Sequence, residues 1–192
     1  MVLRKSGRRN SRVVLRRVVW RSCQLLFRPA VAVSERVVRA TASYRRLEGF
    51  SVGFFDQEAA KECSQKVAEA LALVRSLDPK RFERMRRDVE LVQVFRMKSS
   101  QFSPRWWTCL LDEALVRERS AALIASTLVH EATHARVLRA GIPYWPDLQQ
   151  RIEALCTRQE IAFASKLPRD RFPNTDNYIQ YLRQKVQPQA GS

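Results

Sequence analysis

The sequence has little glycine, few cysteines and only two histidines. Five glycines in 192 residues argue against a glycine-rich all-β fold. The four cysteines, Cys23, Cys63, Cys109 and Cys156, contain no C-x-x-C pair and are too few for a disulfide framework in a chain of this length. We therefore expect reduced thiols in a cytoplasmic protein.

A long apolar run is also missing. No stretch approaches the ~20 consecutive apolar residues that a membrane-spanning helix needs. Charged residues interrupt the apolar clusters of segment 13–38, which argues against a secretory signal. The arginine-rich, acid-poor composition of this segment resembles an organelle transit peptide, and residues 15–26 can form the apolar face of a membrane-surface helix. Both interpretations stay open beside the cytoplasmic one.

Positive charge is concentrated near the N-terminus. Residues 1–50 hold 13 Lys and Arg against 2 Asp and Glu, a net charge of +11, whereas the other 142 residues carry only +5. We predict a basic leader at 1–47, poorly ordered or amphipathic, and a single domain at 48–192. The leader can contact nucleic acid or an anionic membrane, or it can simply keep the chain in solution.

Helical patterns dominate the rest of the chain. Capping residues and apolar spacing predict helices at about 57–77 after Asp56, 80–87, 121–140 after Ser120, 146–166 and 175–186. We expect a strand or entry loop at 49–55, strands at 89–95 and 106–116 that pair with each other, and a loop at 99–104. The predicted fold class is α+β, mainly helical, with a small antiparallel sheet packed on the helix that follows Ser120.

Both histidines lie in the segment His130-Glu131-Ala132-Thr133-His134. Positions i and i+4 share one face of a helix, so two ring nitrogens can reach one metal ion. For two randomly placed histidines, this separation with a Glu after the first arises roughly once in 2000 sequences. Glu131 lies about 100° around the helix, where it can take a proton from water that the metal activates. The motif predicts zinc binding.

A catalytic zinc ion needs a third protein ligand. Because no third histidine exists, that ligand must be a carboxylate or a thiolate, and the helix at 146–166 offers Asp147, Glu153, Cys156 and Glu160. Glu153, Cys156 and Glu160 are spaced i, i+3 and i+7 on one inward face. Buried carboxylates need a partner, which a zinc ion with its histidines would provide.

The motif His130-Glu-Ala-Thr-His134, followed by eighteen residues and Glu153, resembles that of the gluzincin zinc metallopeptidases in a compact single-domain form. The resemblance covers about residues 90–165 and implies a zincin-like fold, with an active-site helix and a following ligand-bearing helix. It implies His130, His134 and Glu153 as ligands and Glu131 as general base and acid. It also implies that the strand at about 107–116 lines the cleft and pairs with an extended peptide.

Two positions depart from the family pattern. Arg136 stands where these peptidases usually have an apolar residue, and Thr157 stands where several place an acidic residue that orients a histidine. Glu160 can fill that supporting role, and it also remains the alternative to Glu153 as the third ligand. Tyr144, Tyr178, Tyr181 and nearby arginines are candidate donors to the oxyanion.

We therefore expect a zinc-dependent metallopeptidase that hydrolyses peptide bonds, with peptides or proteins as substrates. The alternative is a non-catalytic zinc-binding protein whose basic N-terminal segment docks on nucleic acid or an anionic membrane. Cys156 is either a fourth ligand that closes the site or a buried core cysteine. A metal-free helical protein with a coincidental motif is the third possibility.

Overall fold

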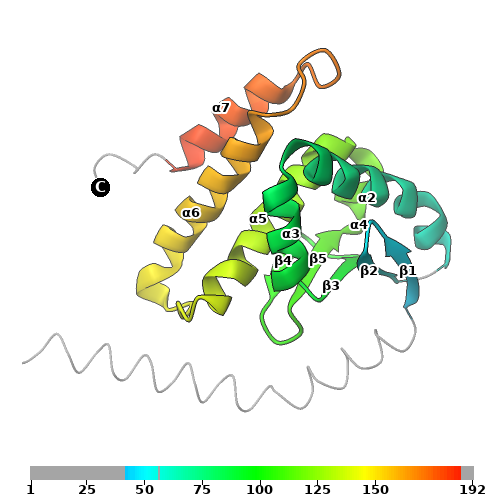
Figure 1. The fold of residues 1–192 in the computed structure, drawn as a ribbon, viewed down its shortest axis with the longest axis horizontal. Coiled ribbons are helices and arrows are strands. Elements are labelled where there is room, and N and C mark those ends of the chain that lie inside the picture. The colour runs from blue at the N-terminus through cyan, green and yellow to red at the C-terminus, as the bar shows by residue number, and fades with distance from the viewer. Residues whose placement is uncertain (1–41, 56, 187–192) are drawn as a thin grey trace, which may run out of the picture. The chain divides into compact units, whose positions relative to one another are not determined.

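The computed structural model describes residues 42–55 and 57–186, which form a mainly helical α+β fold around a five-stranded sheet (Figure 1). The predicted α+β, mainly helical class is thus confirmed. The basic segment at 1–41 and Asp56, the predicted N-cap, lie outside the described residues. Among the described residues, no helix combines the length and the apolarity needed to cross a bilayer.

The sheet is mixed, so the predicted antiparallel sheet is wrong. Its strand order is β1 (Ser43–Leu47), β2 (Phe50–Phe54), β3 (Leu91–Phe95), β5 (Thr108–Asp112) and β4 (Gln101–Ser103). The outer pairs are antiparallel, whereas β3 is parallel to both β2 and β5. The predicted strands at 89–95 and 106–116 do pair, but in parallel, because the chain first forms the outer strand β4 and then returns between β4 and β3.

Three boundaries differ from the predictions. Strand β1 belongs to the sheet, so the leader cannot extend to residue 47; Glu48 and Gly49 form a tight hairpin turn, with φ of 48° and 83°, that pairs β1 with β2. The predicted loop at 99–104 contains β4. The predicted strand at 106–116 ends at Asp112, because Asp112 caps the short helix α4 (Glu113–Glu118).

The predicted helices are all present: α2 (Gln57–Leu77), α3 (Pro79–Asp88), α5 (Ala121–Arg139), α6 (Pro146–Ala164) and α7 (Thr175–Val186). Helix α2 contacts β1 and β2, while α5 contacts β4 and β5, and the two helices pack on each other. The main core fills the space between these helices and the sheet, with Phe54, Leu71, Leu111, Ile124 and Leu128 fully buried.

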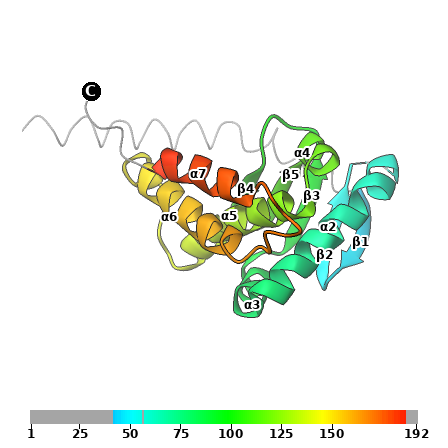
Figure 2. The same cartoon turned by 90° about the horizontal axis from the view of Figure 1, so that it is seen from above.

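Helices α6 and α7 lie side by side, on the side of α5 away from the sheet (Figures 1 and 2). The first half of α6 packs on α5 through a second, smaller cluster of buried Val137, Ile152 and Cys156. Helix α5 therefore has one face toward the sheet and another toward α6, and the two histidines lie on it.

Candidate metal centre

Local sequence determines where α5 begins and ends. The Ser120 hydroxyl accepts a hydrogen bond from the Leu123 amide, as the N-cap prediction required. The helix ends at Arg139, and Gly141 follows its C-cap with a φ of 76°, a conformation that favours glycine. His130 and His134 lie in the middle of this helix, with ring centroids 5.1 Å apart.

Glu153 of α6 faces both histidines. Its Oε2 lies 3.5 Å from His130 Nε2 and 3.7 Å from His134 Nε2. A tetrahedral ion with bonds of about 2.1 Å would hold its ligand atoms about 3.4 Å apart. Glu153 thus lies at nearly that separation from each of the two histidines.

Glu160, one further step along the same face of α6, meets the other nitrogen of His130. Its Oε2 lies 2.9 Å from His130 Nδ1, and its Oε1 accepts a hydrogen bond from the Tyr178 hydroxyl of α7. Glu160 is buried, whereas the Glu153 side chain is 44% exposed. This geometry suits Glu160 as an orienting partner of His130, because it leaves Nε2 directed at Glu153.

Two neighbours support Glu153. The Tyr144 hydroxyl donates a hydrogen bond to Glu153 Oε1, which leaves Oε2 directed at the histidines. The Thr157 hydroxyl donates to the Glu153 backbone carbonyl at 2.9 Å, so its own contact is with the helix backbone and not with a histidine. Of the two residues that the sequence placed around the ligands, Glu160 and Thr157, Glu160 is the one that contacts a histidine.

Electrostatics distinguish the two histidines. Burial lowers the pKa of His134 to about 4, so its imidazole is neutral at pH 7 and can donate a lone pair. Burial acts in the same direction on His130, but hydrogen bonds to Glu153 and Glu160 dominate and raise the pKa of His130 to about 10. The hydrogen bond from His130 is also the main cause that lowers the pKa of Glu153 to about 2. Without a metal, the protonated His130 ring thus donates to the Glu153 carboxylate. Its proton takes the place that a metal cation would otherwise have.

Glu131 is buried beside the histidines. It takes no part in the contacts of the histidines with Glu153 and Glu160 described above. Burial is the main cause that raises its pKa to about 7; the positive charge of His130 opposes this rise, and the carboxylates of Glu153 and Glu160 add to it. The Phe102 backbone amide of β4 donates a hydrogen bond to Glu131. A carboxyl group with a pKa near neutrality can exchange a proton with water at physiological pH.

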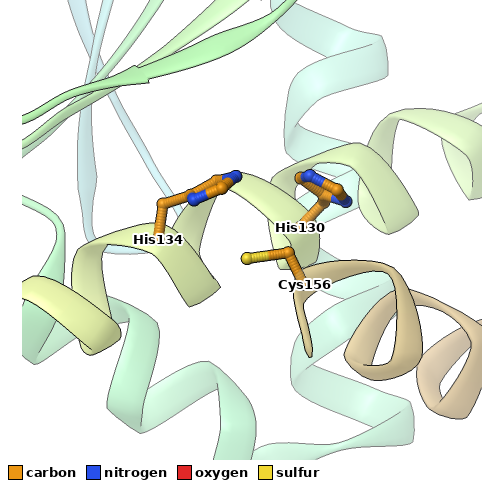
Figure 3. A group of neighbouring side chains, drawn as sticks. All are labelled: His130, His134 and Cys156. Atoms are coloured by element: carbon orange, nitrogen blue, oxygen red, sulfur yellow. The ribbon is translucent and has the colours of Figure 1, made fainter. Parts of the chain in front are cut away.

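Cys156 completes the group from the α6 side. One nitrogen of each histidine and the Cys156 sulfur all lie within 4.8 Å of one another, and the three side chains face one another in Figure 3. This group could hold a metal ion. Burial, followed by the nearby carboxylates, raises the pKa of Cys156 far above its usual range, so the thiol stays protonated unless a cation displaces the proton.

The remaining sequence candidates lie apart from these contacts. Asp147 is exposed in the first turn of α6, Arg136 is exposed on α5, and Tyr181 is 50% exposed on α7. Tyr144 and Tyr178, which the sequence offered as oxyanion donors, instead donate to the two carboxylates.

The sequence did not reveal which strand lies at the site. The resemblance placed the strand at 107–116 along the cleft, but β5 has β3 on one side and β4 on the other, so both of its edges are paired. The strand that contacts Glu131 is β4, at the edge of the sheet opposite β1. Only three residues long, it carries too short a pattern to be recognised before its pairing is known.

Comparison of the chain with protein-family models, with curated proteins and with solved structures finds no match.

Proposed function

We propose that the chain is a zinc-dependent metallopeptidase of the gluzincin type, with a zincin-like fold. One observation carries the proposal: Glu153 Oε2 lies 3.5 and 3.7 Å from the Nε2 atoms of His130 and His134. Two imidazoles and one carboxylate form the ligand set of many catalytic zinc sites, in which the fourth position takes water or substrate.

The chain's own residues orient these ligands. Glu160 fixes the His130 ring through Nδ1, and Tyr178 in turn fixes Glu160. Tyr144 holds the outer oxygen of Glu153, so that Oε2 remains for the ion. When bound, zinc would polarise the substrate carbonyl and lower the pKa of water.

Glu131 is the proposed general base and acid. It accepts a proton as water oxygen forms a bond to the carbonyl carbon, and it passes this proton to the amide nitrogen as the C–N bond breaks. Its position favours this role, because it directly follows His130 and precedes His134 by three residues on the same helix. The Phe102 amide keeps the Glu131 side chain on the β4 side of α5.

Strand β4 is the proposed docking edge for the substrate. In the part of the chain that the structure describes, β4 pairs only with β5, so its outer edge, apart from the Phe102 amide that donates to Glu131, can pair with an extended peptide as a further strand. Because Phe102 of β4 contacts Glu131, a peptide on this edge would pass close to the general base.

The position of Cys156 favours a second candidate, a non-catalytic zinc protein. If the Cys156 thiolate joined His130, His134 and Glu153, the ion would have four protein ligands and no position for water. In that case, activity would lie elsewhere, for example in docking of the basic N-terminal segment on nucleic acid or an anionic membrane.

Metal analysis and peptide cleavage by the full-length chain test the first proposal. We expect one zinc per chain in the wild type and in Glu131→Gln, with cleavage of a peptide library at least about 100-fold slower in Glu131→Gln. Glu153→Gln should lose the metal, whereas Glu58→Gln, an exposed control on α2, should match the wild type. Purification without zinc, or undiminished cleavage by Glu131→Gln, would overturn the proposal.

Cobalt substitution separates the two candidates. A thiolate ligand gives Co²⁺ an intense sulfur-to-metal charge-transfer band in the near ultraviolet, and nitrogen and oxygen ligands do not. A metallopeptidase site predicts no such band and the same spectrum in Cys156→Ser. A band that disappears in Cys156→Ser, together with no cleavage of any peptide, would favour the closed site.

A further inference from the structure

A pocket of about 380 Å³ lies at the N-terminal end of α5, a size typical of small-ligand sites. Three segments form it: residues 118–126, the loop between α6 and α7, and the start of α7. Its walls combine apolar and cationic side chains, among them Arg119, Leu123, Ser126, Arg171, Phe172 and Tyr178.

The charge around the pocket favours an anion. Arg119 and Arg171 contribute two guanidinium groups against the single carboxylate of Glu118. Within residues 42–55 and 57–186, neither arginine forms an ion pair, although Arg171 lies over the Phe172 ring at 6.0 Å. The positive end of the 19-residue helix α5 adds to this potential.

Ser126 provides an independent observation. It lines the pocket, its residue is fully buried, and its hydroxyl has no hydrogen-bond partner among the described residues. A buried hydroxyl without a partner is unfavourable, and a serine inside a helix usually bonds to a backbone carbonyl one turn earlier. A polar group of a ligand would supply the missing partner.

The pocket adjoins the candidate metal centre. Tyr178 lines it and also donates to Glu160, which contacts His130 Nδ1. Along α5, Leu123, Ser126 and His130 follow at i, i+3 and i+7, so they share one face of the helix. A group bound in the pocket would therefore lie within about two turns of His130 along that face.

We propose that this pocket binds a carboxylate-bearing residue of the peptide substrate. The apolar walls at Leu123 and Phe172 would contact its carbon atoms, and the guanidinium groups of Arg119 and Arg171 would bind the carboxylate. The inference rests on the proposed peptidase function, since it names the substrate class of that site. The carboxylate is either an Asp or Glu side chain or the C-terminus of the peptide.

Matched peptides test the pocket in the zinc-loaded full-length protein. One set places Glu or Gln at each position on either side of the cleaved bond, and a second set ends in a free acid or an amide. We expect kcat/KM to favour the carboxylate peptide by about tenfold in one set, which identifies the source. Arg171→Gln and Arg119→Gln should reduce this preference, and Arg183→Gln, a control on α7 outside the pocket, should retain it.

Binding measurements separate this inference from the enzymatic one. The same peptides are titrated into zinc-loaded Glu131→Gln, which should not turn them over. Suppose that the carboxylate peptide binds more tightly, that this difference depends on Arg171, and that the wild type cleaves no peptide. That result would support the carboxylate pocket and contradict the peptidase proposal. The proposed carboxylate pocket would be contradicted if both members of every peptide pair were cleaved and bound equally. It would also be contradicted if neither arginine substitution changed the preference.

Discussion

At the scale of single residues, the two carboxylates of α6 contact different nitrogens of His130, and this difference distinguishes their proposed roles. Glu160 meets Nδ1 and is buried, whereas Glu153 meets Nε2 and is partly exposed. Sequence spacing placed both carboxylates on one face of a helix, and it could not decide between them, because that choice depends on the rotation of an imidazole ring. A third helix, α7, helps to fix the orientation of Glu160, because its Tyr178 hydroxyl donates a hydrogen bond to that carboxylate.

Removal of the Tyr178 hydroxyl should weaken metal binding. In Tyr178→Phe, Glu160 Oε1 loses its donor in a buried position, so the carboxylate holds His130 less firmly. We expect about a tenfold rise in the Kd for zinc, measured by competition with a chelator. Tyr181→Phe, an exposed change on the same helix, is the control. Equal zinc affinity in both variants would show that Tyr178 does not orient the site.

The Glu131–Phe102 contact could not be predicted from sequence for a different reason. Glu131 was identified from its neighbours in the motif, a local pattern. Phe102 lies 29 positions earlier, on a three-residue strand, and its amide is available only because β4 occupies the outer edge of the sheet. Nothing in the local sequence specifies that edge.

At the scale of elements, local signals were sufficient for the helices and insufficient for the sheet. Ser120 and Gly141 predicted where α5 begins and ends, and Pro146 predicted where α6 begins, because caps act on adjacent backbone groups. The order β3–β5–β4 depends on contacts between distant strands, so short apolar runs predicted two of the strands, whereas the predicted antiparallel direction was wrong.

Asp78 joins three elements, and its ionisation should control part of the stability. It caps α3 after the end of α2, and its Oδ2 accepts hydrogen bonds from Arg81 at 2.9 Å and from Lys166, just beyond α6, at 2.7 Å. Burial opposes ionisation, but the hydrogen bonds from Lys166 and Arg81 prevail and lower the pKa of Asp78 from 3.8 to about 2.

Because this pKa is lower in the folded state, the carboxylate contributes stability above about pH 4 and loses that contribution as the pH falls toward 2. Asp78→Asn should therefore reduce the free energy of unfolding by about 2 kcal/mol at pH 7. Urea denaturation across this pH range should show the difference from wild type shrinking below pH 4. Asp170→Asn, an exposed control, should show little difference at any pH; a pH-independent loss in Asp78→Asn would contradict this account.

At the scale of the whole domain, the candidate metal centre lies in the interface between α5 and α6, the most extensive contact between two elements of the described fold. Helix α5 also packs on the sheet, α2 and α3, and the first half of α6 joins it through the cluster of Val137, Ile152 and Cys156. The polar side chains of the centre lie in the same interface. An ion held by His130 and His134 from α5 and by Glu153 from α6 would therefore link the two helices directly.

Zinc should accordingly stabilise the domain against heat. A metal that binds only the folded chain adds about 2.7 kcal/mol at a free concentration 100 times its Kd, which corresponds to a rise in Tm of roughly 5–10 °C for a domain of this size. Calorimetry with zinc and after chelation should show this shift in the wild type and in Glu58→Gln, and not in Glu153→Gln. If chelation leaves the wild-type Tm unchanged, the packing of α6 on α5 does not depend on a metal. The polar contacts between His130 and the two glutamates would then be sufficient to hold this interface.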